Sequence, residues 1–137
     1  MKLFKNRKKK KFYRQLLDKV DRGKWDMELR ILTLKEIREG VRRQFDRTNE
    51  QIKAYEDAIV AERKNKIWDK NKIKGYTELK EQLQGDAQKM QEQMMGKWSE
   101  REGKRVGGID QQIEEVESKI EGGETFREFV KKQMKKL

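Results

Sequence analysis

Asp26 to Val60 reads DMELRILTLKEIREGVRRQFDRTNEQIKAYEDAIV, and this stretch decides the fold. Mostly apolar side chains recur within it at steps of three or four residues, the spacing that places side chains on one face of an α-helix. Charged residues flank this stripe over more than four heptads, a pattern typical of a coiled coil. The stripe consists of Met27, Ile31, Leu34, Ile37, Val41, Phe45, Thr48, Ile52, Tyr55 and Ile59.

The stripe predicts a helix from about residue 26 to residue 74, although Gly40 inside it costs about 1 kcal/mol relative to alanine. Gly75 is the predicted turn, and a second stripe follows it. This stripe predicts a helix over 76–102 that folds back on the first as an αα-hairpin. Its members are Tyr76, Leu79, Leu83, Ala87, Met90, Met94 and Trp98.

The C-terminal part contains glycines that predict shorter elements. Residues 103–108 include three glycines and predict a flexible joint. A helix over 109–121 follows and is expected to end at Gly122-Gly123. Thr125 and Glu128 have the spacing of a capping box, which predicts a last helix over 125–137. One face of that helix is predicted to carry Phe126, Phe129, Val130, Met134 and Leu137.

The N-terminal segment is the most basic part of the chain. Residues 1–24 contain eleven Lys or Arg against two acids, a net charge of +9 out of +11 for the whole chain. Gly23 predicts a break after a short helix over 12–22, and residues 1–11 form a basic arm before it. The remaining 113 residues hold 25 basic and 23 acidic side chains. This asymmetry indicates a negatively charged partner.

These elements predict an all-α, elongated protein, a helical hairpin or coiled coil with shorter C-terminal helices and a basic N-terminal arm. Its predicted segments are 1–24, 25–102 and 103–137. Hydrophobic residues make up 33% of the chain and charged residues 45%, which suits helices that bury a narrow seam rather than a thick core. Disordered chains share this composition, but the periodic apolar residues favour ordered helices over 26–121.

The chain contains no Cys, His or Pro. Without Cys there is no disulfide framework, which suits a reducing intracellular compartment. Without Cys and His, ordinary structural zinc sites and Ser–His or Cys–His catalysis are excluded. No apolar run approaches the roughly 20 residues that span a bilayer. The carboxylates alternate with Lys and Arg as on solvated helix surfaces, so we expect no enzyme activity, no metal site and no cofactor.

Two sets of residues are predicted to contact partners. The N-terminal set would bind phosphates through its basic side chains and stack its aromatic rings on unpaired bases. It consists of Lys2, Lys5, Arg7, Lys8, Lys9, Lys10, Lys11, Phe12, Tyr13 and Arg14, and Phe4 lies beside it. The C-terminal set would assist nucleic-acid binding or, in the alternative of an adaptor protein, dock an acidic protein surface. It consists of Arg127, Lys131, Lys132, Lys135 and Lys136, within a segment, 124–137, of net charge +3.

The expected function is therefore a non-enzymatic structural or assembly protein that binds nucleic acid without sequence preference. One alternative is a coiled-coil adaptor or scaffolding-type protein, of a phage or mobile element, that docks an acidic protein. Another is a peripheral protein on anionic lipid, where basic residues contribute about 1 kcal/mol each. The expected location is intracellular, in the cytoplasm or in a nucleoprotein or virion assembly. A homo-oligomer and an intramolecular hairpin would bury the same stripe, and the two sets of residues would allow the protein to bridge two partners.

Overall fold

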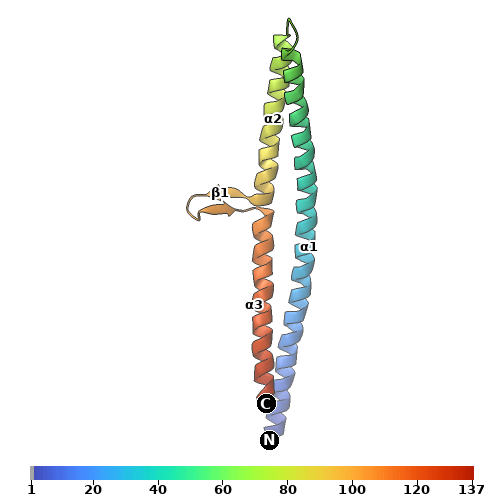
Figure 1. Ribbon diagram of the computed structural model, residues 1–137. Helices are drawn as coiled ribbons and strands as arrows, with labels where there is room; N and C mark the ends of the chain where they lie inside the picture. The colour runs from blue at the N-terminus through green and yellow to red at the C-terminus, as the bar shows by residue number, and fades with distance from the viewer. Residues whose placement is uncertain (1) are drawn as a thin grey trace. The chain divides into compact units, whose positions relative to one another are not determined.

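The computed structural model describes residues 2–137, with side chains described from Lys5 onward. The protein is all-α, with a small β-hairpin (Figure 1). Its elements are α1 (Lys2–Arg63), α2 (Lys70–Met95), β1 (Lys97–Ser99), β2 (Lys104–Val106) and α3 (Ile109–Lys135). The chain forms two compact units. Unit 1 contains the chain up to Lys35 together with Gln112–Leu137, and unit 2 is Glu36–Gln111.

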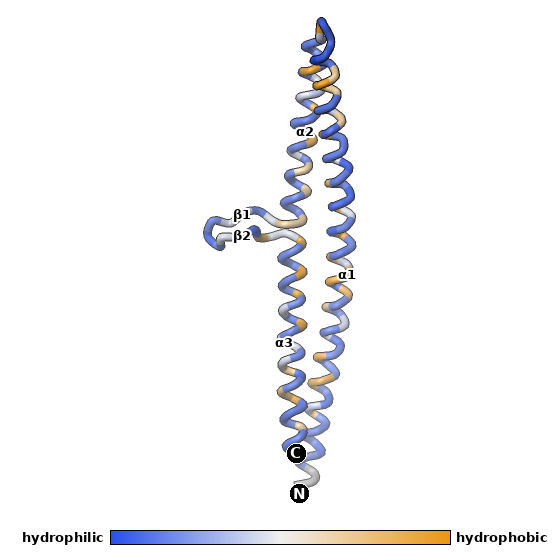
Figure 2. Tube along the Cα trace, in the orientation of Figure 1, coloured by the Kyte–Doolittle hydropathy of each residue, from blue (hydrophilic) through white to orange (hydrophobic). Residues whose placement is uncertain are grey.

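In unit 2, the second part of α1 packs antiparallel to α2 along a seam of apolar residues. The rings of Tyr55 and Tyr76 lie 6.0 Å apart, and the Thr48 hydroxyl donates to the Met90 sulfur at 3.9 Å. Figure 2 shows hydrophobic residues recurring among hydrophilic ones along these helices. The buried residues of this unit are Val41, Thr48, Ile52, Ile59, Ile73, Ala87, Met94 and Ile109. The predicted stripe is thus covered by the same chain.

In unit 1, the first part of α1 packs against α3. Its buried hydrophobic residues are Leu34, Val116 and Val130, of which Val130 is the most enclosed at 1% exposure. On α1, half-buried residues alternate at steps of four and three from Tyr13 through Leu17, Val20 and Lys24 to Met27. On α3, buried and half-buried residues follow the same alternation from Ile113 to Met134. Both helices therefore follow the seven-residue repeat, but with charged or small residues at several seam positions.

The prediction that residues 1–11 form an arm separate from the helices is wrong, because α1 is helical from Lys2 onward. Tyr13 and Leu17 are half-buried in unit 1, and this packing stabilises the helix despite its lysine run. The break predicted at Gly23 is also wrong. Helix continues through Gly23 because the seam residues on both sides of it are packed, which outweighs the roughly 1 kcal/mol that a glycine costs.

The turn between α1 and α2 lies at residues 64–69 and not at Gly75, which belongs to α2. Asp69 is the N-cap residue of α2, and its carboxylate accepts from the backbone N–H groups of Asn71 at 2.9 Å and Lys72 at 3.2 Å. Glu62 in turn accepts from the backbone N–H of Asp69 at 3.0 Å. The aspartate cap satisfies free donors of the first helical turn and so decides where α2 begins.

The joint predicted over 103–108 is part of a β-hairpin, and α2 ends at Met95 rather than at residue 102. Strands β1 and β2 pair antiparallel, with Trp98 opposite Arg105. Gly96 has φ +87°, a conformation that L side chains rarely adopt. A Cβ on Gly108 would overlap backbone atoms of Met94 and Gly96. The two ends of the hairpin therefore meet at a backbone contact that only glycines allow.

In unit 2, the chain that packs against α1 contains more residues than the matching stretch of α1, and the hairpin accounts for the difference. Arg38 pairs with Asp110, and Thr48 contacts Met90. Between Arg38 and Thr48 the chain advances ten residues, whereas between Met90 and Asp110 it advances twenty. This surplus of ten residues is close to the length of the connection between Gly96 and α3, residues 97–108, which contains the hairpin. The hairpin therefore lies outside the helical seam.

Helix α3 continues through Gly122-Gly123 to Lys135, so the two short C-terminal helices predicted there are one. The predicted capping box at Thr125 is also wrong, because its hydroxyl donates to the Glu121 carbonyl oxygen at 3.1 Å inside the helix. A Cβ on Gly123 would meet the Val20 side chain at 3.7 Å, an ordinary contact. Gly123 thus lies on the seam, where unit 1 packs α3 against α1.

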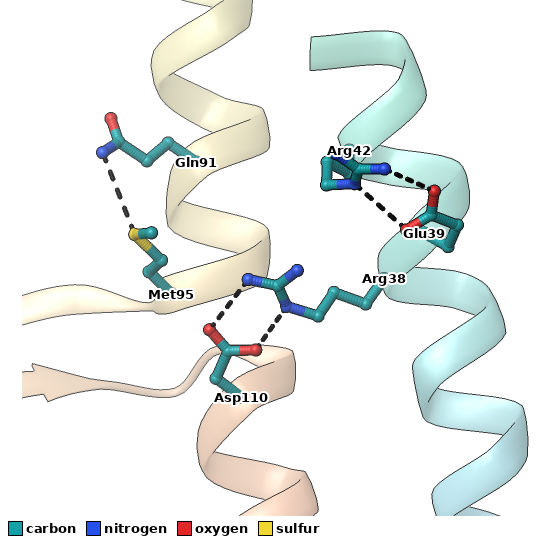
Figure 3. Close-up of polar contacts among 6 residues, drawn as sticks. All are labelled: Arg38, Glu39, Arg42, Gln91, Met95 and Asp110. Carbon is teal, nitrogen blue, oxygen red and sulfur yellow. Dashed lines mark hydrogen bonds and ion pairs between the residues drawn. The ribbon is translucent and has the colours of Figure 1, made fainter. Parts of the chain in front are cut away.

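Four predicted seam residues lie outside the seam: Ile37, Leu79, Phe126 and Phe129 are 48%, 44%, 42% and 56% exposed. Arg38 occupies the seam position next to Ile37 because its guanidinium reaches the Asp110 carboxylate (Figure 3). Trp98, predicted within the second helix, lies on β1 and is 62% exposed.

Candidate nucleic-acid interface

Unit 1 brings the two basic segments of the chain to the same end. The Asn6 side-chain amide donates to the Leu137 carbonyl oxygen at 3.5 Å, so the start of α1 lies beside the end of α3. Both termini appear at this end of unit 1 in Figure 1. The two basic sets of residues therefore lie beside each other. We name residues 2–17 and 129–137 the basic end.

The basic end contains all of the net positive charge of the chain. Residues 2–17 hold eight Lys or Arg and residues 129–137 hold four, and neither segment contains Asp or Glu. The rest of the chain then has 24 basic and 25 acidic side chains, a net charge of −1. Twelve cations without an intervening carboxylate create a strongly positive local potential, which attracts polyanions.

The N-terminal candidate residues lie on consecutive turns of α1. The basic side chains among them are exposed from Lys5 onward: Lys5, Arg7, Lys8, Lys9, Lys10, Lys11 and Arg14. The side chain of Lys2, like that of Phe4, lies outside the described part of the chain. Because successive residues of a helix point about 100° apart, the four lysines 8–11 project in four directions. The cations therefore surround this part of α1 instead of forming one stripe.

The two aromatic candidates of the N-terminal set differ in their surroundings. Phe12 is 57% exposed, whereas Tyr13 is half-buried on the seam. Their ring centroids lie 6.0 Å apart with a 52° tilt. Phe12 can therefore offer a ring face to a ligand, while Tyr13 mainly joins α1 to α3.

The C-terminal candidates divide in the same way. Lys131, Lys132, Lys135 and Lys136 are exposed and contribute to the basic end. Arg127 is half-buried, and its Nε lies 3.3 Å from Asp21 Oδ1 of α1. This ion pair makes Arg127 part of the packing of unit 1. The sequence does not show this, because the pairing depends on the register between α1 and α3.

A second ion pair joins the same two helices. Lys24 Nζ lies 2.8 Å from Glu124 Oε1. This contact raises the pKa of Lys24 and lowers the pKa of Glu124, mainly through the hydrogen bond between them and then through the attraction of opposite charges. Both side chains are more than a third exposed, so the pair fixes register more than it adds stability.

These two ion pairs identify one flank of unit 1, and the exposed aromatic residues lie on the other. Asp21 and Glu124 each come directly after a seam residue in the sequence, whereas Leu16 and Phe126 each come directly before one. Because successive residues of a helix point about 100° apart, Leu16 and Phe126 lie on the opposite side of the seam from Asp21 and Glu124. Phe12 lies one turn before Leu16 and Phe129 one turn after Phe126, so they share that side. We name Phe12, Leu16, Phe126 and Phe129 the aromatic flank. The sequence predicts Phe126 and Phe129 on one face of the helix with Val130, but only Val130 is buried, so the pattern does not reveal this flank.

Unit 2 has polar contacts of a structural kind. Arg38 donates to both carboxylate oxygens of Asp110, and the pKa of Arg38 is raised, chiefly by this hydrogen bond (Figure 3). Arg42 donates to Glu39 at 2.8 and 3.0 Å within α1. An open groove of about 580 Å³ lies beside Trp98 and Arg105 of the hairpin and is lined by Phe45 and several amide side chains. Only the Arg38–Asp110 contact among these joins two helices, α1 and the start of α3.

Among the described residues, no cluster of three or more carboxylates is placed to hold a metal ion. No helix in that part of the chain is long and apolar enough to cross a membrane. No protein-family model matches the chain, and neither a curated protein nor a solved structure is detectably similar to it.

Proposed function

We propose that this chain is a non-enzymatic structural or assembly protein that binds nucleic acid through the basic end of unit 1. The observation that carries the proposal is the juxtaposition of eight basic residues of α1 with four of α3, without a carboxylate in either segment. Phosphates attract such a surface because each contact releases a condensed counterion. Binding of this kind is insensitive to sequence, since it reads the backbone.

The helical form of the N-terminal segment adds to this proposal. Cations that surround α1 can contact phosphates from more than one side, as a nucleic-acid strand passes over the end of the unit. An interfacial membrane helix requires a wide apolar face separated from its cations. Lys8 to Lys11 interrupt such a face on every side. Nucleic acid is therefore favoured over a lipid surface, and the absence of Cys suits an intracellular setting.

The test is the salt dependence of binding to a labelled duplex, measured by fluorescence anisotropy. If about six phosphate contacts form, the logarithm of affinity should fall with the logarithm of salt concentration at a slope near −5. Replacing Lys8, Lys9, Lys10 and Lys11 with Gln should reduce that slope by about 3 to 4. A salt-independent affinity, or a slope unchanged in this variant, would overturn the proposal.

A matched control comes from the turn of unit 2, which is also lysine-rich. Replacing Lys64, Lys66, Lys70 and Lys72 with Gln removes the same charge from exposed positions outside the basic end. This control should keep the original slope. Equal losses in both variants would mean that net charge alone drives binding, and that the basic end is not a site.

The adaptor alternative can be tested with charge substitutions but not with truncation. Residues 125–137 include Val130, the most enclosed side chain described, so deleting them would unfold unit 1. Replacing Lys131, Lys132, Lys135 and Lys136 with Gln leaves the seam intact. Under the proposal, this variant should bind nucleic acid with a slope reduced in the same way as the α1 variant.

A further inference from the structure

We infer that the aromatic flank of unit 1 binds single-stranded nucleic acid, with bases stacked on its phenylalanine rings. This inference deepens the proposed function and rests on it. It names the substrate class, a single strand with exposed bases, for a surface that the charge alone leaves open to duplex and single strand alike. It also assigns a role to the rings of Phe126 and Phe129, which the phosphate contacts of the proposed function leave unused.

The first observation is the exposure of the rings. Phe12, Phe126 and Phe129 are 57%, 42% and 56% exposed, although the seam of unit 1 lies nearby. Leaving apolar rings in water costs free energy, which burying them would recover. Trp25, Leu29 and Leu32 of the same unit are also exposed, but only this flank places three aromatic rings on one side of the α1–α3 pair, which makes it a candidate binding surface.

The second observation is the pairing of these rings with cations. Lys9, Lys19 and Lys136 lie one heptad away from Leu16, Phe12 and Phe129 respectively, so they continue the same flank. Asp21 and Glu124 lie on the opposite flank and are occupied by ion pairs, whereas Asp18 lies beside Phe12 and Leu16, in a shallow hollow that Lys19 and Arg22 also line. The flank therefore combines ring faces with positive charge, the combination that binds a single strand by stacking and by phosphate contact.

The rings of the aromatic flank would distinguish a single strand from a duplex by the base faces that each exposes. In a duplex the base faces are covered by their neighbours, so the rings of this flank would meet only sugar and phosphate. In a single strand each base has a free face, and stacking adds affinity without sequence preference. The inference therefore predicts that single strands bind more tightly than duplexes of equal length at the same salt concentration.

The experiment compares a labelled oligothymidylate with a duplex of equal length by fluorescence anisotropy at one low salt concentration. The test variant combines Phe12→Leu, Phe126→Leu and Phe129→Leu, which keeps apolar side chains but removes the rings. We expect it to lose at least about tenfold in affinity for the single strand and to bind the duplex as before. Trp25→Leu is the matched control, because Trp25 is 63% exposed on α1 of the same unit but not on this flank. It should change neither affinity.

Helicity by circular dichroism verifies that the variants are folded. Equal losses for both ligands, no loss for either, or tighter binding of the duplex by the wild-type chain would overturn the inference. A parallel assay measures sedimentation with vesicles of equal parts phosphatidylcholine and phosphatidylserine. Loss of vesicle binding in the phenylalanine variant, with unchanged oligonucleotide binding, would assign the flank to lipid and also overturn the inference.

The charge variant separates this inference from the proposed function. Replacing Lys8 to Lys11 with Gln should weaken binding of both ligands. If it weakens both while the phenylalanine variant weakens neither, the basic end is a phosphate-binding site and the stacking inference alone fails. If the charge variant binds both ligands like the wild-type chain, the proposed function itself fails.

Discussion

The two units use the same seven-residue repeat for different purposes. Unit 2 fills its seam with residues such as Ile52, Ile59 and Met94, which are less than one-tenth exposed, and has a net charge of +2. Unit 1 has Lys24, Gly123 and Arg127 on its seam and a net charge of +9. Concentrating like charge lowers stability through repulsion, and the seam of unit 1 recovers little of it. The seven-residue repeat thus determines which face of each helix packs, while the side chains at the seam positions determine how stable each unit is.

The largest expected effect comes from truncating matched seam residues in the two units. Ile52→Ala in unit 2 should lower the free energy of unfolding by about 2–4 kcal/mol, because it removes a buried side chain and leaves a cavity. Ile31→Ala, at the equivalent repeat position of unit 1, should cost about half as much, because Ile31 is only half-buried. Urea unfolding measures both. Equal costs would contradict the proposed difference between the units.

Hydrogen exchange can sharpen the same comparison without mutation. Backbone amides of unit 1 should exchange faster than those of the α1–α2 hairpin in unit 2, since local opening follows local packing. Slower exchange in unit 1 would contradict the expectation that unit 1 is the less stable unit.

The next effect concerns the hairpin of unit 2. Deleting residues 97–108 would join Gly96 directly to Ile109. Ile109 would then follow the buried Met94 by three residues, a spacing of the seven-residue repeat, so the residues of α3 would still face the seam. This deletion should preserve thermal stability and raise the helical signal in circular dichroism. Deleting residues 97–107 instead shifts α3 by one residue and should cost about 1–3 kcal/mol through mispacking. Equal stability of the two deletions would show that phase does not matter there.

A smaller gain is expected from a glycine of unit 1. Gly123→Ala should raise stability by about 1 kcal/mol, because the added Cβ meets only an ordinary contact with Val20 and alanine favours the helix. Gly96→Ala in unit 2 is the opposing variant and should destabilise, because its φ is +87° and the backbone of Val106 occupies the space. Thermal unfolding ranks the two. A loss of stability in Gly123→Ala would indicate that α1 and α3 pack too closely at this position for an added Cβ.

The smallest effect is the acid response of the Lys24–Glu124 pair. The pKa of Glu124 is lowered in the folded protein, so its contribution to stability is full above the ordinary glutamate pKa and is lost as pH falls through the lowered value. Glu124→Gln should therefore reduce the acid sensitivity of unit 1, most clearly at low salt. Glu39→Gln is the control. The pKa of Glu39 is also lowered, by Arg42 within α1, so Glu39→Gln should reduce the acid sensitivity of unit 2 and leave that of unit 1 unchanged.

The sequence predicts the features that depend on the spacing of apolar residues alone. It does not predict those that depend on contacts between residues far apart in the chain. The all-α class and most of the stripe on α1, such as Val41 and Ile52, follow from periodicity and are confirmed. The exchange of Ile37 for Arg38 depends on Asp110, more than seventy residues away, and no local pattern reveals it. For the candidate site, exposed lysines were predictable by composition, whereas the withdrawal of Arg127 into the seam was not.

Glycines account for most of the remaining errors. Gly23, Gly75 and Gly122 lie inside helices because flanking seam residues outweigh their intrinsic cost. Gly96 and Gly108, by contrast, close the hairpin through backbone contact. Sequence does not separate these two uses of glycine, since the difference lies in the neighbouring chain. The signal that could have located the true turn was Asp69, followed by free N–H donors that its carboxylate accepts.

The hairpin has a consequence for how this chain can change in length. An insertion within a helix rotates every later residue relative to its partner, so helices that follow a strict repeat tolerate few changes in number. Residues between Ser99 and Lys104 are free of that constraint, because the backbone contact of Gly96 with Gly108 holds the two helix ends whatever lies beyond it. Evolution or an experimenter can therefore add sequence at this loop, such as an epitope or a new binding loop, without disturbing helix phase anywhere else.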